Sequence, residues 1–174
     1  MPHAFEPAAS GRSKCRGCGR ALEKGEIRFG ERMANPFAEG TELTIWFHPM
    51  CAAYKRPESM LEALEQTKDV PGGEALATAA RASLAHQRLP RLDGAERAKG
   101  QAMCRHCREP IPRGEWRIRL VFFEEGRFNP GGFIHVGCSR AYFETDDLLD
   151  RVLHFSRDLS ADDRQEISLS LGRG

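Results

Sequence analysis

The chain has 174 residues, 40% of them hydrophobic, and a formal net charge of +1 at pH 7. This length suits one moderate domain or two small ones, and small lobes with a lean core often need cross-links. No apolar run approaches the roughly 18 to 20 residues that span a bilayer, and the N-terminus has no signal-like segment. We therefore expect an intracellular protein without membrane contact, in the cytoplasm or nucleoid of a bacterium or in the nucleus of a eukaryote.

Positive charge is concentrated in two segments. Ser10–Pro57 contains nine Lys or Arg and five acidic residues, and Lys99–Phe143 contains eight and four, so each segment carries a net charge of +4. The rest of the chain is acidic. The near-neutral total therefore hides two basic regions, a distribution that favours contact with a polyanion.

All six cysteines belong to two copies of one pattern, a Cys-x-x-Cys pair followed by a His-x-x-Cys pair. The spacer between the pairs has 29 residues in the first copy and 27 in the second. Zn²⁺ favours four tetrahedral ligands, and two ligands three positions apart on a tight turn can reach one ion. We predict two Zn²⁺ per chain. The predicted ligands are Cys15, Cys18, His48 and Cys51 in the first site, and Cys104, Cys107, His135 and Cys138 in the second.

Other uses of these thiols remain open at this level. Three disulfides fit less well, because the cysteines fall in tight groups beside histidines in a chain without an export signal. Reduced thiols without metal and an iron site are further alternatives, although three Cys and one His suit structural zinc best. His106, inside the "CRHC" motif, is expected to face solvent rather than to bind the ion.

Hydrophobic periodicity predicts a strand after each Cys-x-x-Cys pair and a returning strand before each histidine ligand. Helical patterns follow the second pair of each copy. The sequence therefore predicts a small α+β fold of two zinc-stabilised antiparallel β-sheet modules, each followed by packing helices. The expected strands cover 26–33, 43–48, 115–123 and 131–135, and the expected helices 57–66, 74–89 and 145–155. The expected domains are an N-terminal tail (1–9), a first zinc module (10–65), a helical linker (66–98) and a second zinc module with C-terminal helices (99–174).

The two copies are similar beyond their metal ligands. "KGEIRFG" in the first aligns with "RGEWRIR" in the second, so that Arg28 and Arg117 both stand ten positions after the second cysteine. Alternation along these strands directs Arg28, Arg117 and Arg119 to the face opposite the apolar residues, which we expect to be the outward face. The chain is therefore interpreted as a duplicated module.

These motifs resemble the poly(ADP-ribose) polymerase-type (PARP-type) zinc finger, which is found in those polymerases and in a nuclear DNA ligase. The matching motifs are "SGRSKCRGC", "KGEIRFG" and "WFHPMC" in the first copy, and "CRHC", "RGEWRIR", "FIHVGC" and "LSADDRQEI" in the second. The resemblance covers most of the chain. It implies recognition of DNA strand breaks through phosphate contacts from basic residues and stacking of apolar loop residues on exposed bases.

The resemblance also implies which residues contact DNA. In the second copy Gln101 takes the place of Arg12, so the role of that copy is less closely defined. From the residues alone, Phe37 can also be a core residue and Arg28 a solvated strand residue. The implied phosphate contacts are Arg12, Arg28, Arg117 and Arg119, and the implied stacking residues are Phe37, Leu43 and Phe128.

These features favour a monomeric, zinc-dependent protein that binds DNA nicks, gaps or ends independently of sequence, in DNA repair or damage sensing, with repair proteins as further partners. The alternative is a zinc-scaffolded protein–protein adaptor without direct DNA binding, which the near-neutral total charge and the acidic helices favour. Enzyme activity is not expected, because each zinc site has four protein ligands and leaves no open position for water. The His-x-Glu that zinc deaminases need is also missing from "HPMC" and "HVGC".

Overall fold

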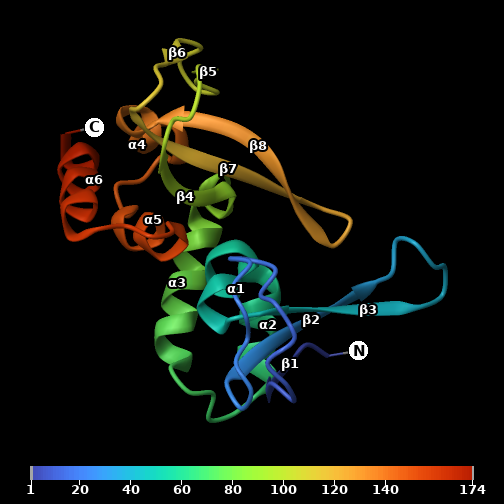
Figure 1. Ribbon diagram of the computed structural model, residues 1–174. Helices are drawn as coiled ribbons and strands as arrows, with labels where there is room; N and C mark the ends of the chain where they lie inside the picture. The colour runs from blue at the N-terminus through green and yellow to red at the C-terminus, as the bar shows by residue number, and fades with distance from the viewer. Residues whose placement is uncertain (1, 174) are drawn as a thin grey trace. The chain divides into compact units, whose positions relative to one another are not determined.

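A computed structural model describes residues 2–173 of the chain. By its contacts the chain divides into an N-terminal unit, Met1–Pro90 with Phe123–Phe128, and a C-terminal unit, Arg91–Phe122 with Asn129–Gly174. Each unit contains an antiparallel sheet and helices (Figure 1), so the predicted α+β fold with two zinc modules is confirmed. Within the described range, no helix combines the length and the apolar character that crossing a bilayer requires.

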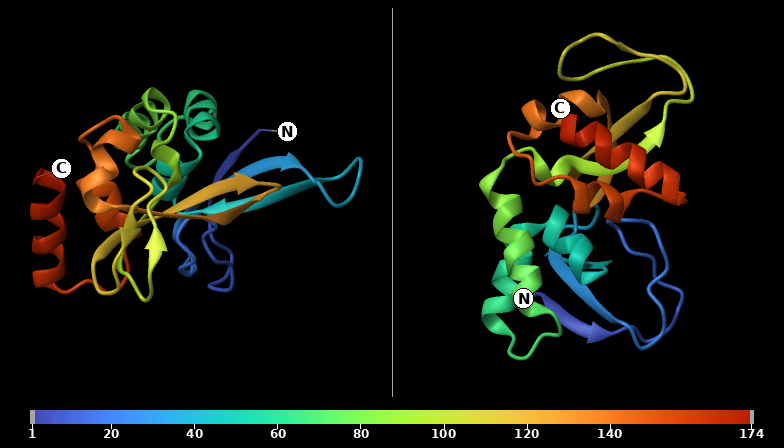
Figure 2. Two further views of the ribbon diagram at one scale, coloured as in Figure 1. Left: turned by 90° about the horizontal axis from the view of Figure 1, so that it is seen from above. Right: turned by 90° about the vertical axis from the view of Figure 1, so that its left-hand side faces the viewer.

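The N-terminal unit is built on a three-stranded sheet. Its strands β1 (Ala4–Pro7), β2 (Ile27–Ala34) and β3 (Glu42–Phe47) are antiparallel neighbours in the order β1-β2-β3. Phe29 on β2 pairs with Phe47 on β3, and both side chains are fully buried because alternation directs them to one face of the sheet. The loop between β2 and β3 projects away from the helices of this unit (Figures 1 and 2).

Three helices follow β3, namely α1 (Pro49–Lys55), α2 (Pro57–Gln66) and α3 (Gly73–Ala85). Proline opens both α1 and α2, a position where the missing N–H would have no helical partner. The three helices contact one another (Figure 1), and Met60 on α2 and Ala80 on α3 are fully buried. The bounds of α2 agree with the prediction, whereas α3 ends four residues before the predicted 89 because the chain becomes extended at His86.

The C-terminal unit repeats this plan. Its main sheet has the order β4-β7-β8, with β4 (Leu92–Arg97), β7 (Trp116–Glu124) and β8 (Arg127–His135). A small second sheet joins β5 (Ala102–Met103) to β6 (Pro110–Ile111). Two 3-10 helices also occur, η1 (Leu89–Arg91), which crosses the boundary between the units, and η2 (Val136–Cys138). The α-helices of this unit are α4 (Ser139–Phe143), α5 (Leu149–Phe155) and α6 (Ala161–Arg173).

The repeat begins earlier in each unit than the sequence pattern indicated. β1 places Glu6 opposite Arg28 on β2, and β4 places Glu96 opposite Arg117 on β7. The predicted tail, residues 1–9, thus supplies an edge strand to the first sheet. The predicted linker, residues 66–98, contains α3 but also β4, the corresponding edge strand of the second sheet.

A buried ion pair links the first sheet to its helices. The Glu31 side chain on β2 is only 3% exposed, and its carboxylate accepts hydrogen bonds from Arg56 at 2.7 Å and from the Ser59 hydroxyl at 2.6 Å. The guanidinium of Arg56 also stacks on the ring of Phe123, 3.8 Å from its centroid. Among the described residues, Arg56 is the cation that pairs with Glu31.

Arg56→Met is expected to lower the free energy of unfolding of the N-terminal unit by about 3 kcal/mol, because it leaves the Glu31 carboxylate buried without its cation. Urea denaturation of the zinc-loaded protein measures this change. The control Arg81→Met removes an exposed arginine from α3 and should stay within about 0.5 kcal/mol of the parent. Equal stability of the two variants would contradict the assigned role of the ion pair.

Candidate metal centres and nucleic-acid interface

The first metal centre joins a tight turn to the start of a helix. Cys15 and Cys18 lie on the turn that follows the bridge between Lys14 and Ala21. His48 directly follows β3, and Cys51 lies in the first turn of α1. The four ligand atoms all lie within 4.8 Å of one another, and Cys15 and Cys51 are buried. The fold of the N-terminal unit thus brings the two predicted pairs together.

The second centre has the same construction in the C-terminal unit. Cys104 and Cys107 lie between β5 and β6, His135 ends β8, and Cys138 ends η2. Their ligand atoms also lie within 4.8 Å of one another. The structure thus brings all eight predicted ligands together in two four-residue clusters.

The donor spacing in both clusters fits a tetrahedral zinc ion. With Zn–S bonds of about 2.3 Å and Zn–N bonds of about 2.0 Å, a sulfur and a nitrogen on one ion are separated by roughly 3.5 Å. The observed separations from His48 Nδ1 are 3.4 Å to Cys18 Sγ and 4.0 Å to Cys51 Sγ. Those from His135 Nδ1 are 3.3 Å to Cys107 Sγ and 3.8 Å to Cys138 Sγ. Each site can thus bind one Zn²⁺ through three sulfurs and one Nδ1.

Contacts behind the ligands orient them for this role. Backbone N–H groups of His48 and His135 donate to the sulfurs of Cys15 and Cys104, at 3.2 and 3.4 Å. His135 Nε2 lies 3.0 Å from the carbonyl oxygen of Pro110, so it carries the proton and leaves Nδ1 free to bind the ion. These contacts hold the thiolates and fix the tautomer of His135.

The electrostatics of the clusters also favour a cation. Hydrogen bonding to Cys15 raises the pKa of the Cys51 thiol and raises the pKa of His48 to about 10. In the second cluster burial raises the pKa of Cys138 to about 12. Burial acts in the same sense on Cys104, but backbone N–H groups outweigh it and lower the pKa of that thiol to about 6. Three close thiolates repel one another, so a set like this either keeps protons or binds a cation in their place.

Lys55 is a supporting residue that the sequence patterns did not reveal. It is only 3% exposed, and its Nζ donates to the carbonyl oxygen of Gly17 at 2.7 Å, inside the turn that carries Cys15 and Cys18. A cation at this point stabilises the negative charge of a three-thiolate zinc site. Its position at the end of α1, four residues after Cys51, is the signal that could have found it.

The predicted DNA-contact residues of the N-terminal unit occupy different environments. Arg12 is exposed, and Phe37 is 68% exposed in the loop between β2 and β3. Leu43 is half-buried on β3, opposite Met33. Arg28 is only 8% exposed, with its guanidinium 3.6 Å from the centroid of the Trp46 ring and 3.0 Å from Glu6 Oε1. The expectation that Arg28 lies on an open outward face is therefore wrong, because the side chains of Trp46 and Glu6 cover it there.

The corresponding residues of the second copy make internal contacts. Arg117 is 7% exposed and stacks on Phe133 at 3.5 Å, so the expectation of an open outward face is wrong for it as well. Arg119 is half-buried and donates to the carbonyl oxygens of Asp93 and Phe155, at 2.7 and 3.2 Å. Phe128 groups with the N-terminal unit, where its ring lies 4.9 Å from that of Phe123 and 6.2 Å from that of Phe47. Their roles in DNA contact stay predictions.

Comparison with known proteins agrees with this geometry. The family described as "Poly(ADP-ribose) polymerase and DNA-Ligase Zn-finger region" matches residues 6–87. A poly [ADP-ribose] polymerase of Sarcophaga peregrina is 27% identical over 161 residues, which cover 79% of this chain and 16% of that protein. Poly [ADP-ribose] polymerase 1 of Gallus gallus is 41% identical over 58 residues, which cover 32% of this chain and 6% of that protein. The chain thus spans only a small part of the length of these relatives.

Two closed Cys₃His clusters on duplicated sheets define a zinc-finger protein with two zinc ions. The family match covers residues 6–87, from β1 to just beyond α3, and it indicates which type of zinc finger this region resembles. The N-terminal unit, which contains these residues, thus resembles the PARP-type zinc fingers. The matched region is a zinc finger and not a catalytic domain.

The purified protein is expected to contain two Zn²⁺ ions, and Cys51→Ala and Cys138→Ala should each reduce the content to one ion. Mass spectrometry of metal content measures this. Because ion binding supplies folding free energy to a small module, excess chelator should also remove much of the circular dichroism signal. The control His106→Ala, which alters a histidine beside the ligands, should retain both ions. Two ions in Cys51→Ala would disprove the assigned ligand set.

Proposed function

We propose that this protein binds DNA strand breaks through its N-terminal zinc finger, independently of base sequence. The single observation that carries the proposal is Phe37, a 68% exposed aromatic side chain in the β2–β3 loop of a PARP-type finger. An exposed aromatic ring in a loop offers a flat apolar face on which a base can stack. The family description names poly(ADP-ribose) polymerase and DNA ligase, which supports DNA as the partner.

A strand break offers a surface that intact duplex hides. At a nick, gap or end, a base pair loses a stacking neighbour, and an apolar side chain can cover the exposed face. Stacking of a base on an aromatic residue contributes about 1 to 3 kcal/mol and does not depend on which base is present. Phe37, with Leu43 at the base of the same loop, would supply this contact.

Phosphate contacts would supply the rest of the affinity. Arg12 and Lys14 are both exposed and lie directly before the zinc ligand Cys15. Arg28 donates to the Ser13 hydroxyl at 3.2 Å, between these two residues. The favoured role of Arg28 is therefore to position the Arg12–Lys14 segment. A direct phosphate contact would require its guanidinium to leave Glu6.

The proposal includes the cellular process in which break binding would act. Break binding by an intracellular monomer without catalytic function would suit DNA repair or damage sensing, with repair proteins recruited to the break. The similarity to poly(ADP-ribose) polymerases supports this setting. Zinc is required in this scheme because the first site joins the Cys15 turn, which follows Arg12, to the end of β3, which follows the Phe37 loop.

Fluorescence anisotropy with gapped, nicked, blunt-ended and closed circular DNA tests the proposal. The zinc-loaded protein should bind the first three more tightly than the closed circle. Phe37→Ala should weaken binding to gapped DNA about 10-fold, since it removes one stacked side chain. The control Leu84→Ala truncates another exposed apolar residue of the same unit, on α3, and should leave affinity unchanged. Equal affinity for all four DNAs would eliminate break recognition.

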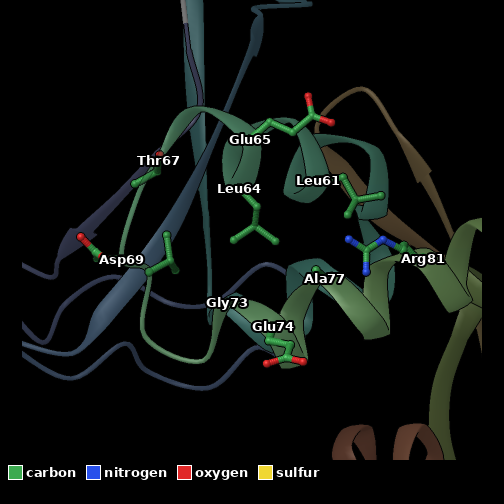
Figure 3. Close-up of a pocket in the computed structure, with 10 residues that line it drawn as sticks. Leu61, Leu64, Glu65, Thr67, Asp69, Gly73, Glu74, Ala77 and Arg81 are labelled. Carbon is green, nitrogen blue, oxygen red and sulfur yellow. The ribbon is translucent and has the colours of Figure 1, made fainter.

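A second candidate function, a zinc-scaffolded adaptor, is favoured by a hollow between α2 and α3 (Figure 3). Its apolar surface comes from Leu61, Leu64, Val70 and Ala77, while Glu65, Asp69 and Glu74 surround it and Arg81 lies at one side. In Figure 3 the carboxylates of Glu65 and Glu74 point away from the hollow. An apolar floor with an acidic rim fits a partner segment that is both apolar and basic.

A Leu64→Lys variant separates this candidate from DNA binding. If the hollow binds a basic partner, this variant should lose a nuclease-resistant partner identified by pull-down from cells, while its affinity for gapped DNA stays unchanged. Ala75→Lys, at an exposed position of α3 that does not line the hollow, controls for added charge. Unchanged partner recovery with Leu64→Lys would exclude the hollow as the docking site.

A further inference from the structure

The C-terminal unit offers a different surface for DNA from the one implied by the resemblance. Arg117 is committed to Phe133 and Glu96, with its guanidinium 3.6 Å from the carboxylate of Glu96. Arg119 is held by the carbonyl oxygens of Asp93 and Phe155. A phosphate would have to displace these partners. A DNA contact that leaves the partners of Arg117 and Arg119 in place must therefore use other cationic side chains of this unit.

A hollow beside the second zinc site supplies such cations. It is lined by Ala102, Met103, Cys104, Arg105, Arg108, Gly132 and Phe133, and we call it the Met103–Phe133 cleft. Met103 is 55% exposed, so its side chain presents apolar surface at the cleft. Phe133 is half-buried, and Arg117 covers one face of its ring. The cleft therefore combines an apolar surface with two arginines.

Both arginines of the cleft are available to a ligand. In the described part of the chain, neither the Arg105 nor the Arg108 side chain has a hydrogen bond or an ion pair, and both residues are exposed. Gly132 permits the position of Arg105, because an added Cβ at Gly132 would lie 2.6 Å from Arg105 Nε. Two unpaired guanidinium groups at one hollow favour a phosphate-bearing ligand.

Comparison of the two modules indicates that only part of this cationic site is particular to the second, because Arg105 has a counterpart, Arg16, in the first. In the first module Arg12 and Lys14 precede the first zinc ligand, whereas Gln101 and Met103 hold these positions in the second. The second module instead carries Arg108 at the position of Gly19. Arg108 has a φ of 67°, close to the 75° of Gly19, a left-handed conformation that is unfavourable for a residue with a side chain. An arginine kept in this conformation is consistent with a functional role.

We propose that the Met103–Phe133 cleft binds one unstacked nucleotide of broken DNA, with its base against Met103 and Phe133 and its phosphate between Arg105 and Arg108. The proposal rests on the function proposed above and extends it to the second zinc finger. The thioether of Met103 is polarisable and adaptable, so it can contact any base. The net charge of +4 on Lys99–Phe143 favours the approach of DNA to this module.

Binding of the full-length, zinc-loaded protein to gapped DNA over a salt series tests this proposal. The double variant Arg105→Ala/Arg108→Gly should weaken binding by about 10-fold or more and, because one phosphate loses its contacts, reduce the slope of log K against log salt by roughly 1. Glycine at 108 preserves the backbone conformation, as Gly19 does in the first module. The control Arg164→Ala removes one exposed arginine from α6 and should have little effect. A zinc content of two ions verifies that each variant is folded.

Met103 distinguishes base contact from simple charge attraction. Met103→Ala should weaken binding to gapped DNA but not to the same DNA with abasic residues in the gap. Met103→Lys restores the residue of the first module, so it would strengthen binding if the cleft attracted phosphate alone, a result that would overturn the assigned base contact. If DNA binding depends on Phe37 but the cleft variants behave like Arg164→Ala, only this inference fails. Absence of DNA binding by the parent protein would overturn the proposed function and this inference together.

Discussion

Each module of this protein depends on a zinc ion that closes a long loop. Spacers of 29 and 27 residues separate the ligand pairs, and within these spacers lie the strands β2 and β7 that form the centre of each sheet. A sheet of three short strands buries too little apolar surface to hold such loops closed. Metal–ligand bonds supply the missing free energy, so binding of the ion and folding of the module are one process.

In both modules a buried arginine further stabilises the sheet that carries the zinc ligands. Arg28 lies between Trp46 and Glu6, and Arg117 lies between Phe133 and Glu96. Burying a guanidinium is costly unless an acid and an aromatic face replace its water. The edge strand of each sheet carries the required acid, which explains why β1 and β4 are integral to the modules. These arginines connect the edge strand to the strand that leads into the histidine ligand.

The two modules share this interior but differ at the surface beside the zinc. The first presents Arg12 and Lys14 before its first ligand and an exposed Phe37 in its long loop, whereas the second presents Met103 with Arg105 and Arg108. Under the function proposed above, this difference gives the two fingers different DNA-contact residues. The difference lies in side chains that do not contribute to the core, where substitution has little effect on stability.

The zinc ligands, the central strands and helix α2 were predictable from the sequence, because ligand spacing and hydrophobic periodicity are local properties. The edge strands β1 and β4 were not, since their pairing joins Glu6 to Arg28 and Glu96 to Arg117 across about 20 residues. The alternation of apolar and polar residues along β2 and β7 correctly placed these arginines opposite the apolar face. It does not predict which residues cover the face on which they lie. Only the tertiary structure brings Trp46 and Phe133 over them and leaves Phe37 exposed, because packing between distant segments decides which side chains water can reach.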